Sequence, residues 1–202
     1  IRGVILVLGY TAPEDVPLLC RWRITQTIVD EAHAQALSAQ GRRLPVHLAL
    51  DTGMHRLGIP SLDTGALRRV FALPNLRIDG VFSHFCVSDC LEPAAVEYTG
   101  AQRDAFFGAV NRLRALGLDP GALHLQASYG LLNLPAQPCD FARAGVALYG
   151  VYSGNAPVVT PLDLRPVLSL RARVATVRHL PPGDKICYLL LFRFTKENFY
   201  IR

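Results

Sequence analysis

The chain has 202 residues, of which 50% are hydrophobic and 18% charged, a composition typical of a globular protein with one sizeable core and unlike a disordered or fibrous chain. Its net charge of +5 comes mostly from arginines spread along the sequence without a basic block, which argues against nucleic-acid binding. Its longest apolar runs, residues 4–8 and 188–192, are far shorter than the roughly 18 residues of a membrane-spanning helix, so we expect no membrane contact from this segment.

Short apolar or β-branched runs alternate with longer segments that favour helices. Strands are predicted at residues 4–8, 24–29, 46–50, 78–83, 123–127 and 141–149. Helices are predicted at residues 30–40, 61–73 and 98–116, ended by Gly41, Pro74 and Gly117. Strand alternating with helix predicts an α/β fold with a parallel sheet.

The pattern changes after residue 154, where prolines interrupt a polar stretch. We therefore predict two domains, residues 1–154 and residues 155–202, the second being a linker and a truncated β-domain. Residues 168–174 alternate between apolar and polar side chains, which favours an antiparallel strand with one packed face. The tail from Leu189 to Arg202 is rich in aromatic residues and lacks this organisation.

The most informative segment runs from Val46 to Ile59, where an apolar strand leads into a polar, glycine-containing turn that presents Arg56. Val46, Leu48 and Leu50 alternate and are suited to a barrel or sheet interior. The following turn lies where the βα loops of a barrel form an active-site rim.

Other polar residues also follow predicted strands. His84 ends the segment 78–84, Ser128 follows the strand at 123–127, and the last stretch contains Arg143, Gly145 and Val146. Loops after the final strands of a barrel commonly bind phosphate through hydroxyl and backbone N–H groups. His84 lies near two cysteines, but a fourth ligand at a usual spacing is missing, so no metal site is expected.

Taken in this order, these segments resemble alanine racemases, pyridoxal-phosphate enzymes that interconvert L- and D-amino acids and supply D-alanine for peptidoglycan. The resemblance covers residues 3–188 and begins at Val4, which looks like the third strand of that family's barrel. It implies an incomplete TIM-type (β/α) barrel followed by the start of a small antiparallel β domain. The barrel's first two strands would then precede Ile1, and we expect the sequence to be a piece of a longer protein.

The resemblance also implies roles for individual residues around pyridoxal 5′-phosphate. Arg56 would bond the phenolic oxygen of the cofactor, Arg143 would face the pyridine nitrogen, and His84 would support Arg143. The phosphate-binding residues would be Ser128, Gly145 and Val146. Tyr188 aligns with the tyrosine that moves the α-proton of an alanine or serine substrate, delivered from the partner subunit of a homodimer.

Lysine is absent from residues 1–184, and the chain contains only Lys185 and Lys196. A covalent pyridoxal-phosphate site requires a Schiff-base lysine, and the family's lysine segment is missing. We therefore expect this chain to be an inactive fragment that binds the cofactor reversibly. The odd, scattered set of cysteines favours reduced thiols and a cytoplasmic protein.

Several departures and alternatives accompany this interpretation. Ala49 stands where many alanine racemases carry a modified lysine, and Ala127 stands where they commonly have asparagine. The amino-acid sequences of the motifs more closely resemble the serine/alanine racemase domains of vancomycin-resistance clusters, in which a membrane module precedes the racemase. A non-catalytic pyridoxal-phosphate-binding barrel is a second class, disfavoured because residues 166–177 begin another domain. An amino-acid decarboxylase is disfavoured by Arg143 and Tyr188, because such enzymes use an acidic partner at the ring nitrogen.

Overall fold

The computed structural model describes residues 3–175, 177–180, 185–186, 192–193 and 198–201. The chain divides into two compact units, Ile1–Arg165 and Pro166–Arg202. Residues beyond 154 remain with the first unit because they bond back onto it. The N–H of Val159 donates to Oδ1 of Asn133 at 3.0 Å, and the N–H of Thr160 donates to the carbonyl of Leu132 at 2.9 Å.

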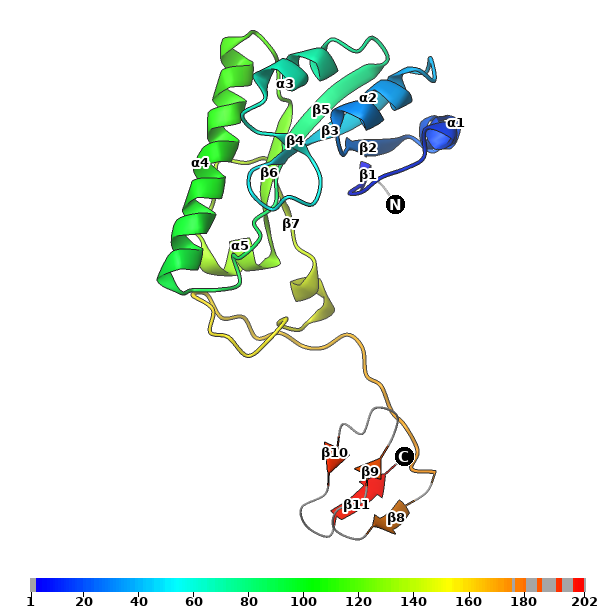
Figure 1. Cartoon of the computed structure of the whole chain (residues 1–202), viewed down its shortest axis with the longest axis vertical. Coiled ribbons are helices and arrows are strands. Elements are labelled where there is room, and N and C mark those ends of the chain that lie inside the picture. Colours follow the sequence, from blue (N-terminus) through cyan, green and yellow to red (C-terminus); the bar gives the residue numbers. More distant parts are fainter. Residues whose placement is uncertain (1–2, 176, 181–184, 187–191, 194–197, 202) are drawn as a thin grey trace. The chain divides into compact units, whose positions relative to one another are not determined.

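The first unit is built on a seven-stranded sheet in the order β1-β2-β3-β5-β6-β7, with the short β4 paired to β3 (Figure 1). Every pairing in this sheet is parallel. The strands are β1 Ile5–Val7, β2 Ile24–Ile28, β3 Leu44–Asp51, β4 Ile59–Pro60, β5 Leu76–Phe82, β6 Ala122–Ala127 and β7 Phe141–Arg143. The prediction of an incomplete parallel barrel with intervening helices is confirmed.

Helices follow most of these strands, as Figure 1 shows. They are η1 Pro13–Asp15, α1 Val16–Arg21, α2 Glu31–Ser38, α3 Thr64–Phe71, α4 Pro93–Ala115, α5 Ser128–Asn133 and η2 Val146–Tyr149. Side-chain caps begin α2 and α3: Asp30 accepts from the N–H of His33, and Asp63 accepts from the N–H of Ala66. Helix α4 ends at Ala115 and is followed by Gly117, whose φ of 72° is the left-handed conformation common just after a helix.

The two faces of β3 are both buried but have different chemistry. Val46, Leu48 and Leu50 belong to the apolar core that includes Leu67 of α3 and Phe106 of α4. The alternate residues, His47, Ala49 and Asp51, face the opposite side of the sheet. The sheet therefore packs its leucines against the helices and leaves its polar residues on the side where the cavity forms.

The last strand of the first unit is shorter than predicted. Residues 141–149 were expected to form one strand, but only Phe141–Arg143 pair with β6, and Val146–Tyr149 form the single turn η2. The turn ends at Gly150 with a φ of 74°. The chain thus bends sharply after Arg143, which brings the backbone of residues 145–147 back toward β6.

The second unit contains two antiparallel pairs: β8 Val177–Leu180 with β11 Asn198–Ile201, and β9 Lys185–Ile186 with β10 Phe192–Arg193. The strand predicted at residues 168–174 was wrong, because these residues form no strand and Leu170 is 95% exposed. Alternating apolar and polar side chains favour a strand with one packed face, but a strand forms only when its backbone has a hydrogen-bonding partner. Within the described part of the chain, residues 168–174 have none.

Candidate functional site

A cavity of about 440 Å³ opens at the carboxyl ends of β3, β5, β6 and β7. Its lining includes every residue predicted to bind the cofactor, namely Arg56, His84, Ser128, Arg143, Gly145 and Val146. They come from different loops and are brought together because the ends of parallel strands meet at one edge of the sheet. Tyr188, the predicted catalytic residue, lies outside the described residues.

The loop that carries Arg56 is organised by Asp51 at the end of β3. One carboxylate oxygen of Asp51 accepts from the N–H groups of Gly53 (2.9 Å) and His55 (3.0 Å), and the other contacts Nδ1 of His55 at 2.8 Å. Partial burial opposes ionisation of Asp51, but these hydrogen bonds outweigh it and hold the carboxyl pKa below its usual value. They also retain His55 in the left-handed region, at a φ of 55°.

A close backbone approach closes the same loop. The N–H of Gly58 donates to the carbonyl of Val29 at 2.7 Å. A Cβ on Gly58 would lie 2.7 Å from the backbone nitrogen of Asp51 and 2.8 Å from the carbonyl carbon of Leu50. Glycine at this position therefore lets the loop fold back against β3 after presenting Arg56.

Arg143, at the end of β7, is the most strongly held cation of the cavity. Its Nη2 donates to the carbonyls of Ser83 (2.6 Å) and Leu125 (3.2 Å), and its guanidinium carbon lies 5.0 Å from the ring centre of Phe82. Burial, reinforced by the charge of Arg56, lowers the pKa of Arg143 to about 10. The guanidinium remains charged at neutral pH.

The remaining partners of Arg143 are histidine nitrogens, and the arginine determines their tautomers. Its Nη1 contacts Nδ1 of His124 at 2.7 Å, and its Nη2 contacts Nδ1 of His84 at 3.3 Å. A guanidinium only donates, so Nδ1 accepts in both rings and the proton of each neutral imidazole is on Nε2. Nε2 of His124 then donates to Nδ1 of His47 at 2.8 Å, which places the proton of a neutral His47 on its own Nε2.

These imidazoles are held in the neutral form. Burial first, and then the charges of Arg143 and Arg56, lower the pKa of His84 to about 4. Burial, Arg143 and His47 lower the pKa of His124 to about 3. Burial also lowers the pKa of His47, although Asp79 opposes the shift. At neutral pH the cavity therefore has guanidinium charge without imidazolium charge beside it.

The other side of the cavity presents backbone donors beside a hydroxyl. The N–H of Gly145 donates to Oγ of Ser128 at 2.8 Å, and the N–H of Ala147 donates to the same oxygen at 3.3 Å. A Cβ built on Gly145 has Oγ of Ser128, 4.0 Å away, as its nearest neighbour. Both N–H groups are satisfied by Ser128 in the ligand-free chain, and a phosphate ester would replace this oxygen as their acceptor.

Sequence patterns missed several residues that support this site. His47 and His124 are 7% and 2% exposed inside otherwise apolar strands, and a buried histidine in such a strand is a recognisable signal. Gln102 was also missed, although it falls on the helical spacing of Phe106, Val110 and Leu113. A polar residue on that buried stripe indicates a specific hydrogen-bonding role.

Comparisons with known proteins agree with one another. The profile of the alanine racemase N-terminal domain family matches residues 1–153. A serine/alanine racemase of Enterococcus gallinarum is 40% identical over 93% of this chain and 27% of its own length. An alanine racemase of Desulfovibrio desulfuricans is 38% identical over 96% of this chain and 53% of its own length.

Solved structures give the same result. An alanine racemase of Bacillus anthracis with bound L-Ala-P superposes with a TM-score of 0.79 and 26% identity, covering 100% of this chain and 53% of that one. The alanine racemase of Clostridium difficile 630 matches with the same TM-score and identity. The chain thus spans about half the length of these alanine racemases.

Among the described residues, no helix has the length and apolarity required to cross a membrane. Across the same residues, histidine, cysteine and carboxylate side chains nowhere gather in a group of three or more suited to a metal ion.

Proposed function

Because this chain belongs to the alanine racemase N-terminal domain family, we propose that it forms the cofactor-binding barrel portion of a pyridoxal-phosphate-dependent amino-acid racemase. The observation that carries the proposal is the convergence of Arg56, His84, Ser128 and Arg143 on one cavity. The chain is similar to an alanine racemase of D. desulfuricans and to a serine/alanine racemase of E. gallinarum. We propose alanine or serine as the substrate.

The donors of the cavity fit pyridoxal 5′-phosphate, an anion with an aromatic nitrogen. The volume of the cavity, about 440 Å³, falls within the range of small-molecule sites, about 300–1,000 Å³. Ser128 and the N–H groups of residues 145–147 would hold the phosphate. Among the described residues, no hydrogen bond uses the Nε–H of Arg143, which leaves a donor for the ligand.

Pyridoxal phosphate, when bound, supplies an electron-withdrawing ring that acidifies the α-proton of an amino acid. Arg143 would donate a hydrogen bond to the ring nitrogen and, with a pKa of about 10, would not transfer a proton to it. Neutral His124 and His84 accept from the guanidinium of Arg143 and so help to fix its position. An unprotonated ring nitrogen is a weaker electron sink, which favours simple return of the α-proton, the step that racemisation needs. Tyr188 is proposed to move that proton in a homodimer.

We propose a cytoplasmic location for the protein. Within the described residues, Cys20, Cys86, Cys90 and Cys139 are free thiols, the usual state in a reducing compartment.

A titration of the purified chain with pyridoxal 5′-phosphate, followed by ligand absorbance and protein fluorescence, tests the proposal. We expect saturable, reversible binding that Arg143→Met weakens by at least about 10-fold, because a charge-assisted hydrogen bond contributes about 1.5–3 kcal/mol. Arg77→Met is the control, since Arg77 pairs with Asp79 at the surface and does not line the cavity. Equal loss in both variants, or absent binding, would contradict the proposal.

A further inference from the structure

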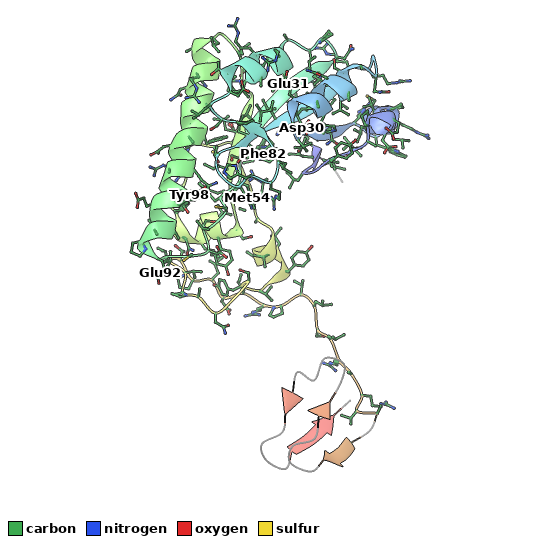
Figure 2. The ribbon with its side chains drawn as sticks, viewed as in Figure 1. Asp30, Glu31, Met54, Phe82, Glu92 and Tyr98 are labelled. Carbon is green, nitrogen blue, oxygen red and sulfur yellow. The ribbon has the colours of Figure 1, made fainter. Side chains whose placement is uncertain are left out.

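Helix α4 contacts two loops of the cavity, the one that carries Arg56 and the one that carries His84, a partner of Arg143. The hydroxyl of Tyr98 donates to the carbonyl of Gly53 at 2.8 Å. Nε2 of Gln102 donates to the carbonyl of His84 at 3.3 Å, and Oε1 of Gln102 accepts from the N–H of Cys86 at 3.1 Å. Figure 2 labels Tyr98 on α4 and Met54, the residue after Gly53. Tyr98 and Gln102 are four residues apart and therefore share one face of the helix.

Burial and two backbone hydrogen bonds fix the side chain of Gln102 in this position. Its side chain is 1% exposed, and both ends of its amide have backbone partners. A buried amide that loses its partners is costly, so the amide and the loop at 84–86 hold each other. The neighbouring residue Thr99 differs, because it is also 1% exposed but its hydroxyl has no hydrogen-bond partner among the described residues.

The other loop rests directly on the same helix face. A Cβ on Gly53 would lie 2.6 Å from the Tyr98 oxygen and 3.6 Å from Cγ of Gln102. Gly53 also has a φ of 128°, which side chains rarely adopt. The loop that presents Arg56 can therefore approach α4 this closely only with glycine at this position.

Gly53 precedes Arg56 in one loop. In the other loop, the backbone of His84 accepts from Gln102 and Nδ1 of its ring accepts from Nη2 of Arg143. We infer that Tyr98 and Gln102 are positioning residues, which set the placement of Arg56 and Arg143 relative to each other by anchoring both loops to one helix. The nature of the ligand that these arginines receive rests on the function proposed above, whereas the anchoring is a property of the free protein.

Hydrogen–deuterium exchange of the ligand-free chain tests the anchoring directly. We expect Gln102→Met to speed exchange at residues 83–90 and Tyr98→Phe to speed it at residues 53–58, each by about 10-fold, the equivalent of one lost hydrogen bond. Residues 24–28 of β2, which pair with β1 and β3 and bond to neither loop, should keep their wild-type exchange. Thr99→Val is the matched control on the same helix and should change none of these segments.

Ligand binding provides a readout that a loss of overall stability would not reproduce. Gln102→Met should weaken binding of pyridoxal 5′-phosphate by about 10-fold, because the ring contacts are displaced. Gln102→Met should leave the binding of inorganic phosphate unchanged, because Ser128, Gly145 and Ala147 make no hydrogen bond with the side-chain amide of Gln102. Tyr98→Phe, a conservative change at a half-exposed side chain, provides the same test if Gln102→Met folds poorly.

The possible outcomes separate this inference from the proposed function. Wild-type exchange in both variants, or faster exchange spread equally over residues 24–28, would overturn the positioning role. Localised exchange in a chain that binds no pyridoxal 5′-phosphate would support the positioning role and reject the proposed cofactor. Cofactor binding with identical affinity in wild type and both variants would reject the positioning role alone.

Discussion

Arg143 determines the electrostatic character of the cavity. Among the described residues its partners are carbonyl oxygens and imidazole nitrogens, and no carboxylate forms an ion pair with it. A buried charge held only by neutral acceptors is incompletely compensated. Its pKa, lowered to about 10 by burial and the charge of Arg56, reflects this. An anionic ligand would therefore gain more here than at a guanidinium that is already paired.

Arg143, His124 and His47 form a hydrogen-bonded chain, here called the histidine relay. Replacing His124 by leucine, which is similar in volume, tests its contribution to stability. The change removes the acceptor of Arg143 Nη1 and the donor to His47 Nδ1. We expect the free energy of unfolding, measured by urea denaturation, to fall by about 2–3 kcal/mol, because buried partners are left unpaired. His55→Asn is a control at an exposed side chain in a loop, and asparagine tolerates its positive φ. A loss no larger than the control's would show that the relay does not stabilise the fold.

The neutral histidines also predict how stability depends on pH. His84 and His124 have pKa values of about 4 and about 3 in the folded chain, against about 6.5 in the unfolded chain. Between these values the unfolded chain binds more protons, so the free energy of unfolding falls as pH decreases from 6.5 toward 4. The slope is at most about 1.4 kcal/mol per pH unit for each histidine.

Denaturation at pH 7.0, 6.0 and 5.0 measures this slope in a window where most carboxyl groups remain ionised in both states. We expect His124→Leu to reduce the slope, since one of the titrating groups is removed. A stability that is constant from pH 7.0 to 5.0 would show that these imidazoles are not held neutral.

At the scale of elements, sequence patterns predicted the strands better than the connections between them. The cores of β2, β3, β5 and β6 were predicted because β-branched and leucine residues recur in them, as is typical of buried strands. Helix α1 Val16–Arg21 and helix α5 Ser128–Asn133 were missed, because each has only 6 residues and shows little helical periodicity. The residues 168–174 had the pattern of a strand but no partner.

The candidate site was predictable where a functional residue ends a strand and unpredictable where it acts across the sheet. Arg56, His84 and Ser128 follow apolar runs and therefore mark the rim. The contact between His47 and His124 joins residues 77 positions apart, so no local pattern contains it. Gln102 likewise acts on loops from a different element.

Gly80 on β5 tests whether close packing of the strands supports the relay. A Cβ there would lie 2.5 Å from the ring of His47 and 2.7 Å from the carbonyl oxygen of Ala122. We expect Gly80→Ala to lower the free energy of unfolding by about 1–3 kcal/mol. Gly100→Ala is the control, because its Cβ meets nothing within 4 Å on α4, and alanine should stabilise the helix by up to about 1 kcal/mol. The prediction would be contradicted if thermal or urea denaturation showed the free energy of unfolding to change in the same direction in both variants.

At the scale of the whole molecule, the sheet of the first unit has β1 and β7 at its two edges. Apolar side chains are exposed there: Ile5 is 42% exposed, Leu8 50% and Phe141 58%. Unpaired edges with exposed apolar residues promote association between chains. We expect sedimentation velocity to show concentration-dependent self-association of the 202-residue chain. Ile5→Lys should reduce it, and a monodisperse monomer at high concentration would refute the expectation.

In the proposed complex, guanidinium, hydroxyl and backbone N–H groups from separate loops hold one pyridoxal phosphate at the carboxyl end of this sheet. A crystal structure of the chain grown with pyridoxal 5′-phosphate measures this most directly. We expect the phosphate beside Ser128 and Gly145, with the ring nitrogen facing Arg143 and the phenolic oxygen facing Arg56. A ligand bound elsewhere, or an empty cavity at saturating cofactor, would contradict the claim.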